Sequence, residues 1–133
     1  MFTIEQIKTE LVKVKTGADF PAYVQELKKL GVVWYETFVS DVHSFYQGKN
    51  GHSVSSPPLF PPIEIEDTAS EKTLKDAIVR HQKGETDFPT IRSQAAAAGV
   101  NKWIVNIEDL TCTYYDKAGK IILVEKIPVP VVR

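Results

Sequence analysis

The sequence predicts an α+β fold in which helices pack on an antiparallel sheet. Apolar residues recur at helical spacing in four stretches, and in the segments that follow they alternate with polar residues, as in half-buried strands. The second half of the chain also repeats the first. We therefore expect a single domain over residues 1–133, made of an internally duplicated helix-helix-strand-strand-strand unit with pseudo-twofold symmetry.

The duplication is visible when the sequence is shifted along itself by 68 residues. Nine identities then fall between positions 19 and 51 without a gap. They pair Asp19-Phe20-Pro21 with Asp87-Phe88-Pro89, Gly31-Val32 with Gly99-Val100, Asp41 with Asp109, Tyr46 with Tyr114, Lys49 with Lys117 and Gly51 with Gly119. The predicted repeats span about residues 3–56 and 68–128, joined by a proline-rich linker at 57–62. Two copies are too few for a solenoid, so we expect one shared core.

The first helix of each half has a clear start signal. Thr3 and Thr68 are each followed three residues later by Gln or Glu, which is the capping-box pattern. We expect these helices to end at Gly17 and Gly84, because glycine readily adopts the left-handed conformation that closes a helix.

The second helix of each half is predicted to begin after an aspartate. Asp19 and Asp87 each precede Phe-Pro, and the first turn of a helix tolerates proline because its amide would be unpaired there. Gly31 and Gly99 mark the expected ends of these helices.

Three strands are expected in each half, with an additional short edge strand after the linker. The alternation over 33–39 and 102–107 marks the first strand of each half, and turn residues separate it from the second and third. The remaining predicted segments are strands at 42–47 and 110–115, turns at 48–51 and 116–119, and the edge strand at 63–66.

One face of the first strand carries a group of aromatic residues. A tight turn after this strand would place Phe38 opposite His43 and Glu36 opposite Phe45, and Trp34 lies on the same face. Such a patch is typical of an interface or a ligand groove, unless the linker covers it. A carboxylate next to an imidazole can also perform acid and base chemistry, so Glu36 and His43 are a candidate pair.

A histidine interrupts the apolar stripe of the third helix. His81 stands where the first copy has Val14, so its imidazole points toward the interior. It is either a structural histidine with a hydrogen-bond partner or a general base or ligand-binding group, and Thr86 and Asp87 are near enough in sequence to orient it.

Two other features have mainly structural interpretations. The alanines at 95–98 favour close helix packing, with room for a small ligand as the alternative. Cys112, the single cysteine, is predicted to be a buried, inert thiol. One cysteine and three dispersed histidines indicate neither a disulfide scaffold nor a metal site, and no motif indicates a cofactor.

Composition excludes several partners. The net charge of −1 offers no field to attract nucleic acid. No apolar run is long enough to span a membrane, and no signal-peptide pattern begins the chain. We therefore expect a cytoplasmic protein with neither nucleic-acid nor membrane partners.

Several segments resemble the YbcV-like family of small bacterial and prophage-borne proteins, often labelled "phage envelope protein". The resemblance runs from about residue 2 to residue 128. It rests on GADFPAY at 17–23, LGV at 30–32, YET at 35–37, HQKGETD at 81–87 and TCTYYD at 111–116. The resemblance implies a small cytosolic α+β domain with no assigned reaction, cofactor or catalytic residue. Asp41-Val42 departs from the Asp-Gly of the family pattern. The family pattern therefore does not define the type of the turn after the first strand, nor the register of Glu36 with His43.

These observations favour a non-enzymatic ligand-binding or protein-interaction module. It would use either the face of Trp34 and its neighbours or the cleft between the halves, with a homodimer partner or a small-molecule ligand. The alternative is a small hydrolase or isomerase with a histidine general base, either His81 or the Glu36 and His43 pair.

Overall fold

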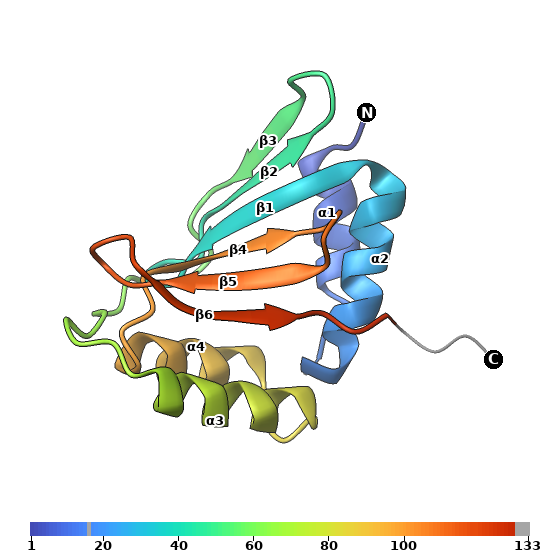
Figure 1. Ribbon diagram of the computed structural model, residues 1–133. Coiled ribbons are helices and arrows are strands. Elements are labelled where there is room, and N and C mark those ends of the chain that lie inside the picture. The colour runs from blue at the N-terminus through green and yellow to red at the C-terminus, as the bar shows by residue number, and fades with distance from the viewer. Residues whose placement is uncertain (16, 130–133) are drawn as a thin grey trace.

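A computed structural model describes residues 1–15 and 17–129, and its fold is α+β, as the sequence predicts (Figure 1). In the first half, α1 (Ile4–Leu11), the 3-10 helix η1 (Gly17–Asp19) and α2 (Phe20–Leu30) precede β1 (Val32–Phe38), β2 (Ser44–Gly48) and β3 (Ser53–Ser56). In the second half, α3 (Glu71–Gln82) and α4 (Phe88–Ala97) precede β4 (Lys102–Asn106), β5 (Thr111–Tyr115) and β6 (Ile121–Lys126).

The six strands form one antiparallel sheet in the order β3-β2-β1-β4-β5-β6. The central pair is β1 and β4, and Glu36 lies opposite Ile104, the residue that a shift of 68 makes its equivalent. The strand pair β1 and β2 has the same register as β4 and β5 under that shift. This is the arrangement that two copies about a pseudo-twofold axis would have; the duplication itself stays a prediction.

The helices lie in two pairs on the same side of the sheet, α1 with α2 and α3 with α4 (Figure 1). We call the helix-covered side the inner face; its residues include Tyr35, Val105 and Cys112, all buried. The opposite side is the outer face, where Trp34 and Phe38 are half-buried. One hydrophobic core contains residues of both halves. The two helical pairs meet where α3 contacts η1.

The predicted start of the first helix is confirmed and that of the third is wrong. The Thr3 side chain accepts the Gln6 backbone N–H at 3.2 Å, and the Gln6 side chain accepts the N–H of Thr3 at 2.8 Å. In the third helix the capping residue is Ser70, not Thr68. The N–H of Ser70 donates to the Ala98 carbonyl at the end of α4, so tertiary contact fixes where α3 begins.

The predicted end of the first helix is wrong. Helix α1 ends at Leu11, and Gly17 lies in η1 with no positive φ. A Cβ at Gly17 would lie 2.4 Å from both Cδ2 and the carbonyl oxygen of His81, so glycine is needed there for close contact with α3. Gly84, by contrast, follows α3 with φ +79°, as expected for a residue that closes a helix.

Only one of the two predicted aspartate caps is present. Asp87 accepts the N–H of Thr90 at 3.0 Å and caps α4. Asp19 makes no side-chain cap to α2; its carboxylate accepts the N–H of Lys15 at 2.8 Å and fixes the turn after α1. Gly31 ends α2 in the left-handed conformation, with φ +102°.

The linker at 57–62 has no regular secondary structure, and the edge strand predicted just after it does not form. The N–H of Ile63 donates to the Ser40 carbonyl, and that of Glu66 donates to the Ala96 carbonyl. These bonds run to a loop and to a helix end, so the segment cannot join the edge of the sheet.

Candidate functional site

The two helical pairs and the inner face of the sheet line a partly open cavity of about 320 Å³. All four helices contribute to its walls, and so do five of the six strands. Tyr35, Tyr46 and Trp103 face it from the sheet, and Leu74 and Ile78 face it from α3. We call this space the inner cavity; it lies between the two halves of the chain, at one of the two places that the sequence suggested for a ligand.

The linker closes one side of the inner cavity, and a buried arginine holds it there. Leu59 and Phe60 line the cavity, and the Arg92 guanidinium lies 5.0 Å from the centre of the Phe60 ring. Arg92 also donates to the carbonyls of Val39 and Pro61, both at 2.9 Å, and to that of Ser40. Sequence reasoning missed this residue, because an arginine on a helix usually faces solvent.

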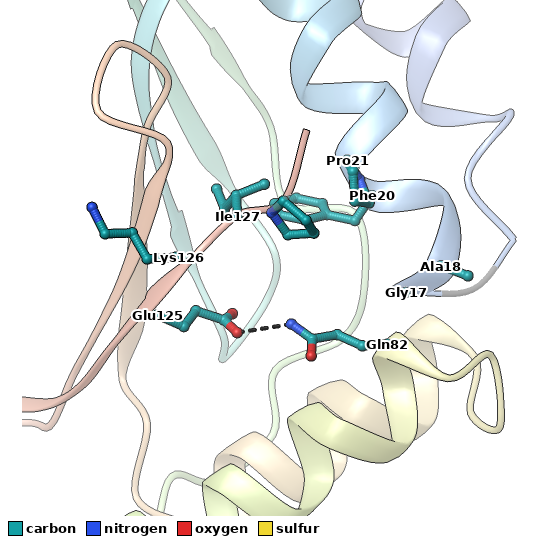
Figure 2. Close-up of a pocket in the computed structure, with 9 residues that line it drawn as sticks. Gly17, Ala18, Phe20, Pro21, Gln82, Glu125, Lys126 and Ile127 are labelled. Carbon is teal, nitrogen blue, oxygen red and sulfur yellow. Dashed lines mark hydrogen bonds between the residues drawn. The ribbon is translucent and has the colours of Figure 1, made fainter. Parts of the chain in front are cut away.

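Figure 2 shows a second pocket, of about 330 Å³. We call it the outer pocket. Gly17, Phe20, Gln82 and Glu125 line both spaces, so these residues form the boundary between them. Across this boundary the Gln82 amide donates to Glu125 Oε2 at 2.9 Å, which links α3 to β6.

Three tyrosines cluster in the wall formed by α2, β1 and β2. The rings of Tyr23 and Tyr35 lie 6.3 Å apart, and those of Tyr35 and Tyr46 lie 5.2 Å apart. Burial is the main cause that raises the pKa of all three hydroxyls. The Tyr23 hydroxyl is buried and has no hydrogen-bond partner of normal geometry among the described residues, although Tyr46 is close enough to contribute to its raised pKa. It is therefore a polar group that a ligand can satisfy.

Acidic and weakly acidic groups gather where β5 meets β6. The Tyr114 hydroxyl donates to Glu125 Oε1 at 2.5 Å. Burial is the largest cause that raises the pKa of the Glu125 carboxyl, and hydrogen bonds from Tyr114 and Gln82 partly oppose it. Cys112 is a buried free thiol, as predicted, and burial strongly raises its pKa. A thiol of this kind is a poor nucleophile at neutral pH.

His81 also lines the inner cavity and is partly buried. Its Nδ1 lies 3.1 Å from the Thr86 carbonyl oxygen and 3.0 Å from the Thr86 hydroxyl, so Thr86 orients the ring as the sequence suggested. Because a carbonyl only accepts, Nδ1 carries the proton and Nε2 is left as the basic nitrogen. Burial lowers the pKa of His81, which keeps the imidazole neutral at pH 7.

On the outer face the predicted register is correct, but the predicted acid–base pair does not form. Glu36 lies opposite Phe45, as expected. The Glu36 carboxylate instead pairs with Lys102 at 3.0 Å, and His43 Nδ1 lies 2.6 Å from Asp41. The hydrogen bond from His43 is the main cause that lowers the pKa of Asp41. Each group of the candidate pair therefore has a different partner.

The aromatic residues of the outer face pack against one another. The rings of Trp34 and Phe45 lie 5.7 Å apart, and Phe38 stacks on His43 at 4.4 Å. The linker does not cover them, since Leu59 and Phe60 line the inner cavity on the other side of the sheet. The predicted site residues thus fall in two places, with His81 alone facing the inner cavity and the other five on or beside the outer face.

Metal and membrane features are absent from the part of the chain that the structure describes. Residues 1–15 and 17–129 contain no group of three or more His, Cys, Asp or Glu side chains that could hold a metal ion. Over the same residues, no helix combines the length and the apolar character needed to cross a bilayer.

Comparisons with known proteins identify a family but no activity. A family model described as "Protein of unknown function (DUF1398)" matches residues 8–126. Uncharacterised proteins of Mycobacterium bovis and Mycobacterium tuberculosis are each 27% identical over 97 residues. The match covers 72% of this chain and 59% of each relative, so the chain spans less than two thirds of their length. On the extent of the family match, the chain belongs to the DUF1398 family of proteins of unknown function.

Proposed function

We propose that this protein binds a small, mostly apolar molecule in the inner cavity. The observation that carries the proposal is a partly open space of about 320 Å³ whose walls are chiefly aromatic and aliphatic side chains from both halves. Pockets for small molecules have this character: an apolar lining with a few placed polar groups, located between structural units. The polar groups among the lining residues include Tyr23, His81 and Glu125.

The size of the cavity, which is partly open, is sufficient for a small molecule. An apolar cavity of about 150 Å³ already suffices to bind benzene. A space of about 320 Å³ therefore fits a ligand of one or two fused rings.

The chemistry of the lining favours binding over catalysis. His81 Nε2 can accept a proton, as a hydrolase or isomerase with a histidine base requires. Burial, however, raises the pKa of Cys112 and of Tyr23, which weakens both as nucleophiles. The Glu36 and His43 pair, the other proposed base, is not formed.

Filling the cavity from within tests the proposal. Ala95 lines the inner cavity and is 2% exposed, whereas Ala97, two residues along α4, is exposed. Titration calorimetry with neutral ring compounds, indole and 1-naphthylmethanol, should detect binding to the wild type. Ala95→Met should abolish it, because the flexible side chain occupies the space.

The matched control is Ala97→Met, which adds the same side chain to the same helix but on its solvent side. It should bind both compounds as the wild type does. Binding that survives in Ala95→Met while circular dichroism shows an unchanged fold would place the ligand elsewhere, and no binding of either compound to the wild type would contradict the proposal.

A second candidate function is contact with another protein chain through the outer face, including a second copy of this chain. The observation that favours it is the half-exposed group of Trp34, Phe38 and Phe45, which the helices leave uncovered. Light scattering after size exclusion should report a dimer for the wild type and a monomer for Trp34→Ala. A monomer for both would remove the homodimer.

The proposal also includes a narrower family for this chain and its location in the cell. We propose that the chain is a YbcV-like protein with a prophage association and that it works in the cytoplasm. The net charge of −1 supports a small-molecule or protein partner over a nucleic acid.

A further inference from the structure

Among the residues that the structure describes, Glu125 carries the one carboxylate that lines both spaces of the site. It lies on β6 at the boundary between the inner cavity and the outer pocket (Figure 2). Its two oxygens accept hydrogen bonds from Tyr114, at 2.5 Å, and from Gln82, at 2.9 Å. Both donors are neutral, so they orient the carboxylate without compensating its charge.

No cationic side chain of the described residues compensates the negative charge of Glu125. Within residues 1–15 and 17–129, no lysine, arginine or histidine nitrogen forms an ion pair with Glu125. The residues that line the inner cavity include neither lysine nor arginine. In Figure 2 the side chain of Lys126 points away from the Glu125 carboxylate. A partly buried carboxylate without a cation is unfavourable, because desolvation penalises the charged form.

The neighbours of Glu125 do not supply a positive charge by titration either. Cys112 and Tyr114 are acids, and their effect on Glu125 in the ionised state would be repulsive. His81 lies on the same cavity, but burial holds its imidazole in the neutral form. The negative charge at the boundary is therefore available to a ligand.

Aromatic rings complete the environment that a cation prefers. Phe88, Trp103 and Tyr114 line the inner cavity in a connected row, with ring centres 6.3 Å apart for each successive pair. Phe20 and Tyr23 add two more rings near the boundary. The faces of such rings attract organic cations, with tryptophan the most effective.

We propose that the natural ligand is a lipophilic amine: its apolar ring system occupies the inner cavity and its ammonium group donates hydrogen bonds to the Glu125 carboxylate at the boundary. This inference rests on the proposed function and adds the chemical class of the ligand. The ammonium would supply the charge that the chain lacks there, while the apolar body would displace weakly held water from the aromatic wall.

A series of three ligands with one ring system separates this inference from the proposed function. The cation is 1-naphthylmethylamine, the neutral reference is 1-naphthylmethanol and the anion is 1-naphthoic acid, all titrated by calorimetry at pH 7 and low salt. The wild type should bind the amine about tenfold or more tightly than the alcohol, and the acid more weakly than the alcohol.

Glu125→Gln keeps the shape and the acceptor oxygen for Tyr114 but removes the charge. It should reduce the preference for the amine over the alcohol to about onefold. Glu108→Gln, which removes an exposed carboxylate in the turn between β4 and β5, should keep the wild-type preference.

The outcomes are distinct. If the alcohol binds the wild type but the amine binds no better, the amine proposal is overturned and the cavity proposal stands. If the preference persists in Glu125→Gln, Glu125 is not its source and the inference is again overturned. If no member of the series binds, both proposals fail. Should Glu125→Gln not fold, the order of the three ligands on the wild type still decides the question.

Discussion

The two faces of the sheet differ in how their polar groups are satisfied. On the outer face, Glu36 pairs with Lys102 and Asp41 pairs with His43. At the inner cavity, Tyr23 has no hydrogen-bond partner of normal geometry among the described residues, and Glu125 has only neutral donors. Buried polar groups in native proteins are usually satisfied, so the exceptions need an explanation. The comparison therefore favours the inner cavity as the ligand site.

Packing shows the same contrast. The inner face carries the buried residues of β1, β4 and β5, yet it also bounds a cavity large enough for a ligand. On the outer face, the rings of Trp34 and Phe45 are half-buried against one another. A cavity lacks the contacts that packed side chains would make, and this destabilises the fold. Such a cavity is expected where a bound ligand supplies the missing contacts.

The largest difference between the faces should appear when one isoleucine on each is truncated. Ile107 is 1% exposed in the core, whereas Ile121 on β6 is 59% exposed. Ile107→Ala should lower the free energy of unfolding by about 3 kcal/mol, since it removes buried methyl groups and leaves a void. Ile121→Ala should cost about 0.5 kcal/mol or less. Urea denaturation measures both, and similar costs would contradict the assignment of the inner face as the core.

A smaller loss is expected when the linker is released from the inner cavity. Arg92→Met keeps much of the side-chain volume but leaves the carbonyls of Val39, Ser40 and Pro61 without their donor. The cost should be about 2 kcal/mol, as for hydrogen bonds from a charged group. Arg80→Met, at an exposed position of α3, is the control and should have little effect. Equal urea midpoints for the two variants would show that Arg92 does not hold the linker.

The next effect is a loss of stability with rising pH, which the raised pKa of Glu125 predicts for the inner site. Burial raises the pKa of Glu125 above its usual value of 4.5, so folding disfavours the ionised form. Relative to Glu125→Gln, the wild type should therefore be most stable below pH 4.5 and lose stability as the pH rises through the raised pKa. Each unit of raised pKa corresponds to about 1.4 kcal/mol. Denaturation of both proteins between pH 4 and 8 measures the difference, which should not stay constant.

Local sequence rules predicted the strands well because few arrangements satisfy them. A tight turn and the two-residue period of a strand leave essentially one register, and Glu36 is found opposite Phe45 as expected. The same rules failed at Gly17 and Thr68, where tertiary contacts decide the outcome: Gly17 packs on His81, and Ser70 is held by Ala98. Such contacts join residues far apart in sequence and have no local signature.

The candidate site was predictable only in outline. The pseudo-twofold pattern indicated a cleft between the halves, and His81 was expected to face inward. Glu125 and Arg92 were missed, because charged residues on a strand near the chain end and on a helix are normally solvent-exposed. The volume of the cavity depends on how far apart the helical pairs sit on the sheet, which no local pattern encodes.

The smallest expected effect concerns the ion pair of the outer face. Glu36 and Lys102 lie on adjacent strands, with their side chains 21% and 28% exposed and their charged atoms 3.0 Å apart. A double-mutant cycle with Glu36→Gln and Lys102→Met should give a coupling energy of about 0.5 kcal/mol, because water and salt screen a partly exposed pair. Adding sodium chloride should reduce this coupling further. A coupling as large as the loss in Arg92→Met would mean that the outer face, too, holds a strongly desolvated polar site, and the contrast between the two faces would no longer locate the ligand.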